Sequence, residues 1–156
     1  MISVHLTRRE NLTALLKRLL REELGHPVEI VKTPKGKPYI GGNEIYFSLS
    51  YSGKKGAVAL SDSPVGVDLE YLGERDFPAV LSNFTERERQ EILTMEDFTR
   101  HWTAKEAFIK MHGYTPASAF NHTEYFGGQI YFKGDKQPCE VIHHKLGKTG
   151  ILAICK

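Results

Sequence analysis

Gly66-Val67-Asp68-Leu69-Glu70 is the most informative stretch of the chain. It places two carboxylates two positions apart, directly after a glycine, in a segment that is otherwise apolar. Side chains alternate between the two faces of a β-strand, so Asp68 and Glu70 should share one face. Two carboxylates on one face repel each other unless a cation lies between them, and magnesium prefers oxygen ligands. The stretch therefore predicts a strand that carries two ligands of a divalent cation.

A second run, Trp102-Thr103-Ala104-Lys105-Glu106-Ala107-Phe108-Ile109-Lys110, has the spacing of a helix. Glu106 and Lys110 are four positions apart and should lie on one helix face, whereas Trp102 should pack in the core. Glu106 and Lys110 add a third carboxylate and a cation suited to phosphate, so the two runs together predict a magnesium–diphosphate site. The plainer alternatives are a hydrated acidic strand and an ordinary helix salt bridge, worth only about 0.2–0.5 kcal/mol.

Bulk composition limits the class of protein. The chain has 156 residues, of which 40% are hydrophobic and 26% charged, with a formal net charge of +2. These values are typical of one compact domain and too mildly basic to indicate nucleic-acid binding. Apolar runs are too short for a membrane span, and the first residues lack the layout of a signal peptide. Cys139 and Cys155 are expected to be reduced thiols. A cytoplasmic enzyme or binding domain fits these observations.

The clearest predicted helix begins at Thr7. Thr7 and Glu10 have the spacing of a capping box, leucines recur at helical spacing over residues 12–24, and Gly25 provides the stop. The opposite face of this helix is basic, through Lys17, Arg18 and Arg21.

Strand and helix patterns alternate along the rest of the chain. Thr85 and Glu88 form a second predicted capping box, and a longer helix is predicted over residues 95–111. Strands are predicted over residues 28–32, 39–40, 45–51, 57–60, 65–72, 129–133, 140–144 and 150–155. Short turns between the earlier strands favour an antiparallel meander. We therefore expect one α+β domain of two related halves, residues 1–65 and 66–156, each with helices packed on a mainly antiparallel sheet, with the active site in the groove between them.

Two further runs, Lys37-Pro38 and Phe47-Ser48-Leu49-Ser50-Tyr51-Ser52, precede the first two in the chain. Together the four runs resemble the 4′-phosphopantetheinyl transferase superfamily (holo-acyl-carrier-protein synthases), in particular its larger type, over roughly residues 35–133. The family transfers the phosphopantetheine arm of coenzyme A to a serine of an apo carrier protein and releases 3′,5′-ADP. The resemblance implies magnesium as cofactor, coenzyme A as co-substrate and an acyl or peptidyl carrier protein as partner. It places the chain in fatty-acid, polyketide or nonribosomal-peptide biosynthesis.

Residue by residue, the resemblance implies metal ligands at Asp68, Glu70 and Glu106. It makes Glu106 and Lys110 the catalytic residues, the first as a base or as the acid that positions a water, the second as the diphosphate-binding lysine. The coenzyme A-binding residues that it implies are Lys35, Lys37, Ser50, Tyr51 and Lys110. Glu88 matches a further family glutamate, although helix capping explains its presence equally well.

Two features depart from the family pattern. Tyr51 stands where the family has a histidine, and tyrosine can donate a hydrogen bond to phosphate but carries no positive charge near neutral pH. The segment before Gly66 is short for the larger type, so we expect a reduced N-terminal half. Whether the chain forms an oligomer that completes the site is a question that the sequence leaves open.

Three alternatives follow from these departures and from the charge pattern. One is a non-catalytic relative that binds coenzyme A or a carrier protein without transfer, and another is a different magnesium-dependent diphosphate enzyme, such as a hydrolase. The basic helix face at Lys17, Arg18 and Arg21 is either a docking surface for an acidic carrier protein or simply a hydrated surface.

Overall fold

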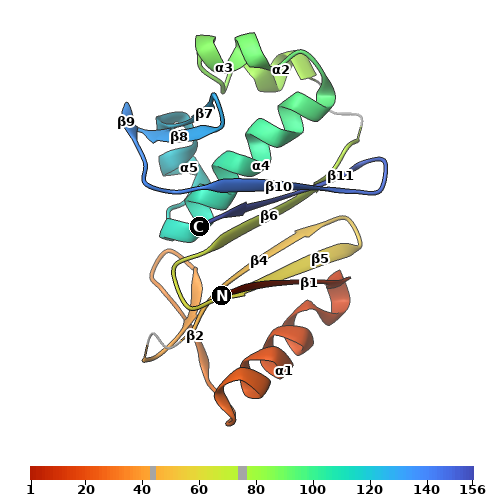
Figure 1. The fold of residues 1–156 in the computed structure, drawn as a ribbon, viewed down its shortest axis with the longest axis vertical. Helices are drawn as coiled ribbons and strands as arrows, with labels where there is room; N and C mark the ends of the chain where they lie inside the picture. Colours follow the sequence, from red (N-terminus) through yellow and green to blue (C-terminus); the bar gives the residue numbers. More distant parts are fainter. Residues whose placement is uncertain (43–44, 74–76) are drawn as a thin grey trace.

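A computed structural model describes residues 1–42, 45–73 and 77–156 of the chain (Figure 1). The elements of the first part are β1 (Ile2–Arg8), η1 (Arg9–Asn11), α1 (Leu12–Leu24), β2 (Ile30–Lys32), β3 (Pro38–Ile40), β4 (Tyr46–Ser52) and β5 (Lys55–Ser61). The elements of the second part are β6 (Gly66–Tyr71), α2 (Phe77–Leu81), α3 (Glu86–Glu91), α4 (Met95–His112), α5 (Pro116–Ala119), η2 (Phe120–His122), β7 (Thr123–Phe126), β8 (Gln129–Phe132), β9 (Asp135–Lys136), β10 (Val141–Leu146) and β11 (Gly150–Cys155).

Two three-stranded antiparallel sheets form the centre of the fold, with orders β1-β5-β4 and β10-β11-β6. Figure 1 shows α1 outside the first sheet and α4 outside the second, so the sheets lie between the two helices. Smaller antiparallel sheets, β2-β3 and β7-β8-β9, flank them. This arrangement confirms the predicted α+β class with helices on antiparallel sheets. Among the described residues, no helix combines the length and apolar character needed to cross a bilayer.

Buried apolar side chains form three clusters that hold these layers together. One joins α1 to its sheet and includes the predicted stripe at Leu12, Leu16, Leu19 and Leu20. Another surrounds α4 and contains Phe98, Phe108 and Ile109. The third lies between the two sheets and includes Val67, Leu69 and Leu152.

A seam of serine side chains joins the two sheets at β4 and β6, which do not pair as a backbone ladder. Serines occupy every second position of β4, and their hydroxyl oxygens accept hydrogen bonds from the backbone N–H groups at every second position of β6. The pairs are Val67 N to Ser48 Oγ (3.0 Å), Leu69 N to Ser50 Oγ (3.0 Å) and Tyr71 N to Ser52 Oγ (3.2 Å). The residue numbers increase in the same direction in both strands, so β4 and β6 run in parallel. The seam fixes the position of one sheet relative to the other.

The close contact between α4 and β6 depends on Gly66. A Cβ atom at this position would lie 1.8 Å from the carbonyl oxygen of Ala107, so only glycine allows the helix to pack here. The helix begins at a capping box formed by Thr94 and Asp97 and ends at Gly113, whose φ of 68° is left-handed. The glycine of the acidic run therefore sets the distance between the strand and the helix that carry the predicted site.

The prediction that a helix begins at Thr7 is wrong. Thr7 lies in β1 and pairs with Gly56 of β5, and α1 begins only at Leu12 after a short 3-10 turn. The backbone ladder between β1 and the central strand β5 runs from Ile2 to Arg8, and this long-range pairing outweighs a local capping box with Glu10. The second predicted capping box, at Thr85, is confirmed.

The predicted meander breaks at residues 65–72. A strand forms there as β6, but its partner is β11 and not its sequence neighbour β5. Because β5 already pairs with β1 on one edge and β4 on the other, it has no edge left for β6. Strand β7 was not predicted; it pairs with β8 beside α3.

Candidate functional site

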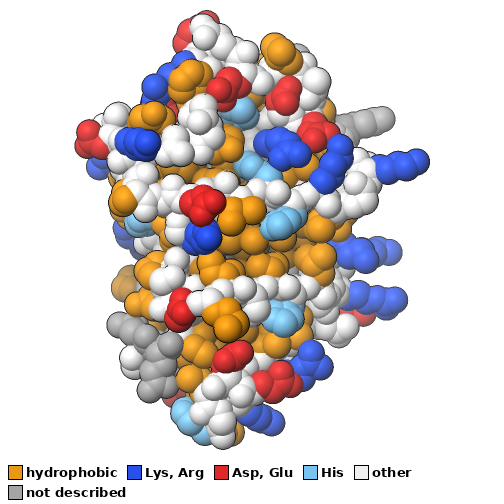
Figure 2. Space-filling model, in the orientation of Figure 1, with side chains coloured by type: hydrophobic (Ala, Val, Ile, Leu, Met, Phe, Trp, Pro, Cys, Tyr) orange, Lys and Arg blue, Asp and Glu red, His pale blue; other side chains and the backbone are white. Residues whose placement is uncertain are grey.

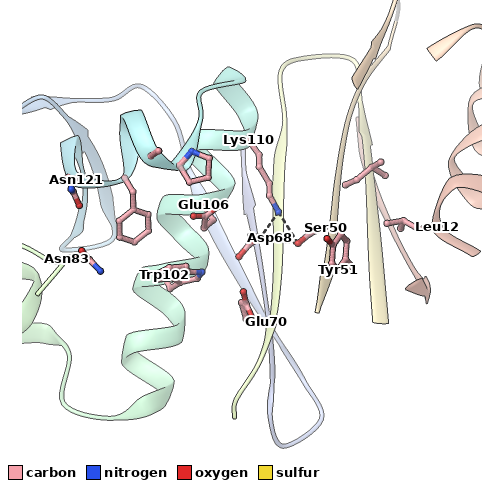
Figure 3. Close-up of a pocket in the computed structure, with 14 residues that line it drawn as sticks. Leu12, Ser50, Tyr51, Asp68, Glu70, Asn83, Trp102, Glu106, Lys110 and Asn121 are labelled. Carbon is pink, nitrogen blue, oxygen red and sulfur yellow. Dashed lines mark hydrogen bonds and ion pairs between the residues drawn. The ribbon is translucent and has the colours of Figure 1, made fainter. Parts of the chain in front are cut away.

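An open groove with a volume of about 820 Å³ lies between the serine seam and α4 (Figure 3). This volume is within the range of small-molecule binding sites. The groove is lined from both parts of the chain, and six predicted site residues meet in it. They are Ser50, Tyr51, Asp68, Glu70, Glu106 and Lys110.

Asp68 lies at the floor of the groove and is only 4% exposed. Lys110 extends from α4 and its Nζ donates a hydrogen bond to Oδ1 of Asp68 at 2.7 Å (Figure 3). The other oxygen, Oδ2, is buried and has no hydrogen-bond partner among the described residues. Burial raises the pKa of Asp68, and the charge of Lys110 opposes that rise. A buried carboxylate oxygen without a partner is costly unless a ligand satisfies it.

Ser50 connects the seam to these two charges. Its hydroxyl donates to Oδ1 of Asp68 at 3.0 Å and accepts from Nζ of Lys110 at 3.0 Å and from the backbone N–H of Leu69 at 3.0 Å. With one donor and two acceptor positions used, the hydroxyl has no hydrogen-bonding capacity left. Ser50 therefore holds both charged groups in place.

Glu70 and Glu106 face the same groove from β6 and α4. Oε2 of Glu70 accepts a hydrogen bond from Ser52 at 3.3 Å. Burial, followed by the negative charge of Asp68, raises the pKa of Glu106 to about 7, although Lys110 opposes the rise. Lys110 pairs with Asp68 across the groove, so its main contact is not the helix salt bridge that its spacing from Glu106 also allowed.

The donors around this groove suit a hard divalent cation in their chemistry. Across residues 1–42, 45–73 and 77–156, no three His, Cys, Asp or Glu side chains already stand close enough to hold an ion. The ammonium of Lys110 instead provides the positive charge beside Asp68. Even so, Oδ2 of Asp68 has no partner among the described residues, and burial together with the charges of Asp68 and Glu70 raises the pKa of Glu106, so an added cation would offset negative charge here. Oxygen donors with uncompensated charge are what magnesium requires.

Residues 64–155, more than half of the chain, match the family described as the 4′-phosphopantetheinyl transferase superfamily. The chain belongs to this superfamily. The match begins just before β6 and includes α4, so it contains the three acids and the lysine that line the groove.

The 4′-phosphopantetheinyl transferase gsp of Aneurinibacillus migulanus is 29% identical over 85% of this chain and 61% of that protein. The 4′-phosphopantetheinyl transferase psf-1 of Bacillus pumilus is 30% identical over 90% of this chain and 67% of its own length. The 4′-phosphopantetheinyl transferase AcpT of Salmonella typhi is 37% identical over 61% of this chain and 55% of its own length. The chain thus spans between 55% and 67% of the length of these relatives.

Two predicted coenzyme A-binding residues of this superfamily member lie outside the groove. Lys37 and Lys35 line an adjoining cavity of about 230 Å³, whose wall also includes Lys110. Nζ of Lys37 donates to the carbonyl oxygen of Met111 at 2.7 Å, at the C-terminal end of α4, and burial lowers the pKa of Lys37. Nζ of Lys35 lies 5.8 Å from the ring centroid of Tyr114. Both lysines therefore approach Lys110 from a second cavity.

Glu88 is fully buried and does not line the groove. Its carboxylate closes the predicted capping box, accepts the backbone N–H of Tyr125 at 2.9 Å, and pairs with Nζ of Lys105 at 3.3 Å. That ammonium lies 4.4 Å and 4.1 Å from the ring centroids of Phe84 and Phe120. This buried pair joins α3 to α4, and its ammonium contacts Phe120, which lines the groove.

Several groove residues were not predicted as such. Trp102 packs against the core cluster around α4, as expected, but it is only half-buried and also lines the groove, with its ring centroid 4.7 Å from that of Phe120. Asn83 and Asn121 line the same end, and no spacing signal in the sequence identifies them. Arg9 does not line the groove, but its guanidinium carbon lies 3.7 Å from the centroid of the ring of Tyr51, which does, and this contact was not predicted.

Proposed function

We propose that this chain transfers the 4′-phosphopantetheine arm of coenzyme A to a serine hydroxyl of an apo carrier protein and releases 3′,5′-ADP. The observation that carries the proposal is the convergence of Asp68, Glu70, Glu106 and Lys110 on one groove. Membership of the superfamily supports it, as do the names of relatives such as those from Aneurinibacillus migulanus and Bacillus pumilus.

The chain's own residues divide the chemistry between them. The serine oxygen forms a bond to the β-phosphorus, the bond from that phosphorus to 3′,5′-ADP breaks, and the serine proton leaves to a base. Glu106 is suited to accept this proton, directly or through water, because its carboxylate faces the groove in which the other charged groups meet. Lys110 supplies positive charge for the diphosphate and its leaving group.

We propose magnesium as the cofactor, held by Asp68, Glu70 and Glu106. The chemistry of the donors supports this assignment, since Oδ2 of Asp68 is buried without a partner among the described residues and the charges of Asp68 and Glu70 add to the rise in the pKa of Glu106. When bound, the ion would neutralise charge on the diphosphate.

A loading assay tests the proposed function. The chain is mixed with coenzyme A, magnesium and an apo acyl or peptidyl carrier protein, and mass spectrometry follows the addition of the phosphopantetheine arm. Asp68→Asn and Glu106→Gln should each lower the rate by about 10²–10³, as expected for loss of one charged group at a reacting centre. Glu29→Gln, which changes an exposed carboxylate far from any predicted run, should load at the wild-type rate.

Three results would contradict the proposal in distinguishable ways. Binding of coenzyme A without any mass gain on a range of carriers would indicate a non-catalytic relative. Release of 3′,5′-ADP without carrier modification would indicate a hydrolase. Full activity of the Asp68→Asn variant would mean that the groove is not the active site.

A further inference from the structure

A second groove, which we call the outer groove, lies between the free edges of the two central sheets. Its walls include Ile2, Val4 and Leu6 of β1 and Ile142 and Leu146 of β10, and its volume is about 490 Å³. Figure 2 shows hydrophobic side chains gathered in a band across the middle of the molecule, over the space between β10 and β1 in Figure 1. Among the described residues, none lines both the outer groove and the groove that holds the acids.

The outer groove continues the apolar cluster that lies between the two sheets. Ile2, Val4 and Leu146 line the groove and also pack against that cluster. In the described parts of the chain, β1 pairs only with β5 and β10 only with β11, so each strand keeps one unpaired edge. Unpaired strand edges next to an exposed apolar patch are typical of a surface that another chain covers.

The two central sheets share one connectivity, and this indicates which chain fits the outer groove. In each sheet, the first strand is followed by a helix and then by a hairpin, whose second strand takes the centre. The elements are β1, α1, β4 and β5 in the first sheet and β6, α4, β10 and β11 in the second. β1 therefore corresponds to β6, and β10 corresponds to β4. Because the serine seam joins β4 to β6, the two free strands are the equivalents of the two joined strands.

Equivalent leucines of β1 and β6 differ in burial. Ala57 and Leu152 are each the third residue of the central strand, and their partners are Leu6 in β1 and Leu69 in β6. Leu69 is fully buried beside the seam, whereas Leu6 is 52% exposed. The seam thus covers one leucine of this pair, and the fold of a single chain leaves the other open to water.

Strand β10 carries apolar side chains where its equivalent, β4, carries serines. Ser52 and Leu146 are the last residues of these two strands, and Ser48 and Ile142 lie four residues before them. The serines of β4 accept hydrogen bonds from β6, whereas Ile142 and Leu146 line the outer groove. Apolar side chains are stabilised by removal from water, so this composition favours contact with protein.

We propose that a second copy of this chain covers the outer groove, in a twofold-symmetric dimer in which β1 of each copy lies against β10 of the other. The two contacts close the assembly, so that no free edge is left for a third copy. The contact is apolar packing and not a repeat of the serine hydrogen bonds, because Ile142 and Leu146 replace the serines. The apolar clusters of the two copies then form one continuous core.

Sedimentation velocity of the full chain at micromolar concentrations tests this dimer. The wild type should sediment with twice the chain mass of 17.7 kDa. Leu6→Glu should raise the dissociation constant of the dimer by at least about 100-fold, because it places a carboxylate in both apolar contacts. The matched control, Leu93→Glu, changes a leucine that is 79% exposed between α3 and α4, outside the outer groove, and should sediment as the wild type does. Both leucines are exposed in the single chain, so circular dichroism should show both variants folded.

Cross-linking tests which strands meet. The equivalents of Val4 and Ile142 are Val67 and Ser48, which are hydrogen-bonded in the seam. A short bismaleimide should therefore join chains that carry Val4→Cys to chains that carry Ile142→Cys when the two are mixed. Either variant alone should give only the background of the native cysteines, which the wild type measures.

Several results would overturn the inference. A wild type that stays monomeric, or a dimer that neither Leu6→Glu nor Ile142→Glu weakens, would show that the outer groove does not hold a second copy. Cross-linking of Val4→Cys chains to each other, and not to Ile142→Cys chains, would contradict the pairing of β1 with β10. A monomer whose β1 and β10 become protected from hydrogen exchange only when an apo carrier protein is added would assign the outer groove to that protein instead.

Discussion

Replacing Glu106 with glutamine should stabilise the ligand-free protein at alkaline pH while it lowers the rate of transfer. Burial and the neighbouring carboxylates raise the pKa of Glu106 to about 7 from an ordinary value of 4.5. Between these values the folded chain binds more protons at this group than the unfolded chain does. The contribution of Glu106 to the free energy of unfolding therefore falls as the pH rises from about 4.5 to about 7, and stays low above that. Glutamine does not ionise, so the free energy of unfolding of the variant does not fall at this position as the pH rises.

The size of the effect follows from the two pKa values. At about 1.36 kcal/mol for each pKa unit, the ionised carboxylate is disfavoured by at most about 3 kcal/mol. Because the side chain borders an open groove, water and salt reduce this penalty, and we expect about 1–2 kcal/mol. For a chain of 156 residues, this raises the melting temperature by about 2–8 °C.

Thermal unfolding followed by circular dichroism at pH 8 and pH 4.5 measures the effect. Glu106→Gln should melt above the wild type at pH 8, and the difference should vanish at pH 4.5. Glu29→Gln, at an exposed carboxylate, should match the wild type at both pH values. Magnesium with coenzyme A should raise the melting temperature of the wild type more than that of the variant. A variant no more stable than the wild type at pH 8 would refute the idea that repulsion between carboxylates destabilises the empty groove.

Two further predictions concern the contacts that align the site. Ser48→Ala leaves the buried N–H of Val67 without its acceptor and should lower the free energy of unfolding by about 1–3 kcal/mol in urea titrations, whereas Thr13→Ala at an exposed position of α1 should not lower it. Gly66→Ala should cost more than about 3 kcal/mol and abolish carrier loading, because the new methyl group would overlap the carbonyl oxygen of Ala107; wild-type stability and loading would show that α4 need not contact β6 so closely.

The two acidic runs were readable from the sequence because their signals are local. Alternation along a strand places Asp68 and Glu70 on one face of that strand. A spacing of four residues places Glu106 and Lys110 on one face of a helix. The structure brings all four to one groove, as expected, while the catalytic and metal-binding roles assigned to them stay predictions. Of the two capping boxes predicted from local spacing, the one at Thr85 forms. The one at Thr7 does not form, because Thr7 pairs with β5 in a sheet.

The order of residues alone determined the α+β class, most helix and strand positions, and which acids share a face, since these depend on periodicities of two and about 3.6 residues. Only the tertiary structure decided that β6 pairs with β11, that Lys110 neutralises Asp68, and that Arg9 rests on Tyr51. Each of these contacts joins residues far apart in the chain. Which of them form depends on the strand edges left unpaired and on how closely the layers pack, and no local sequence pattern encodes either.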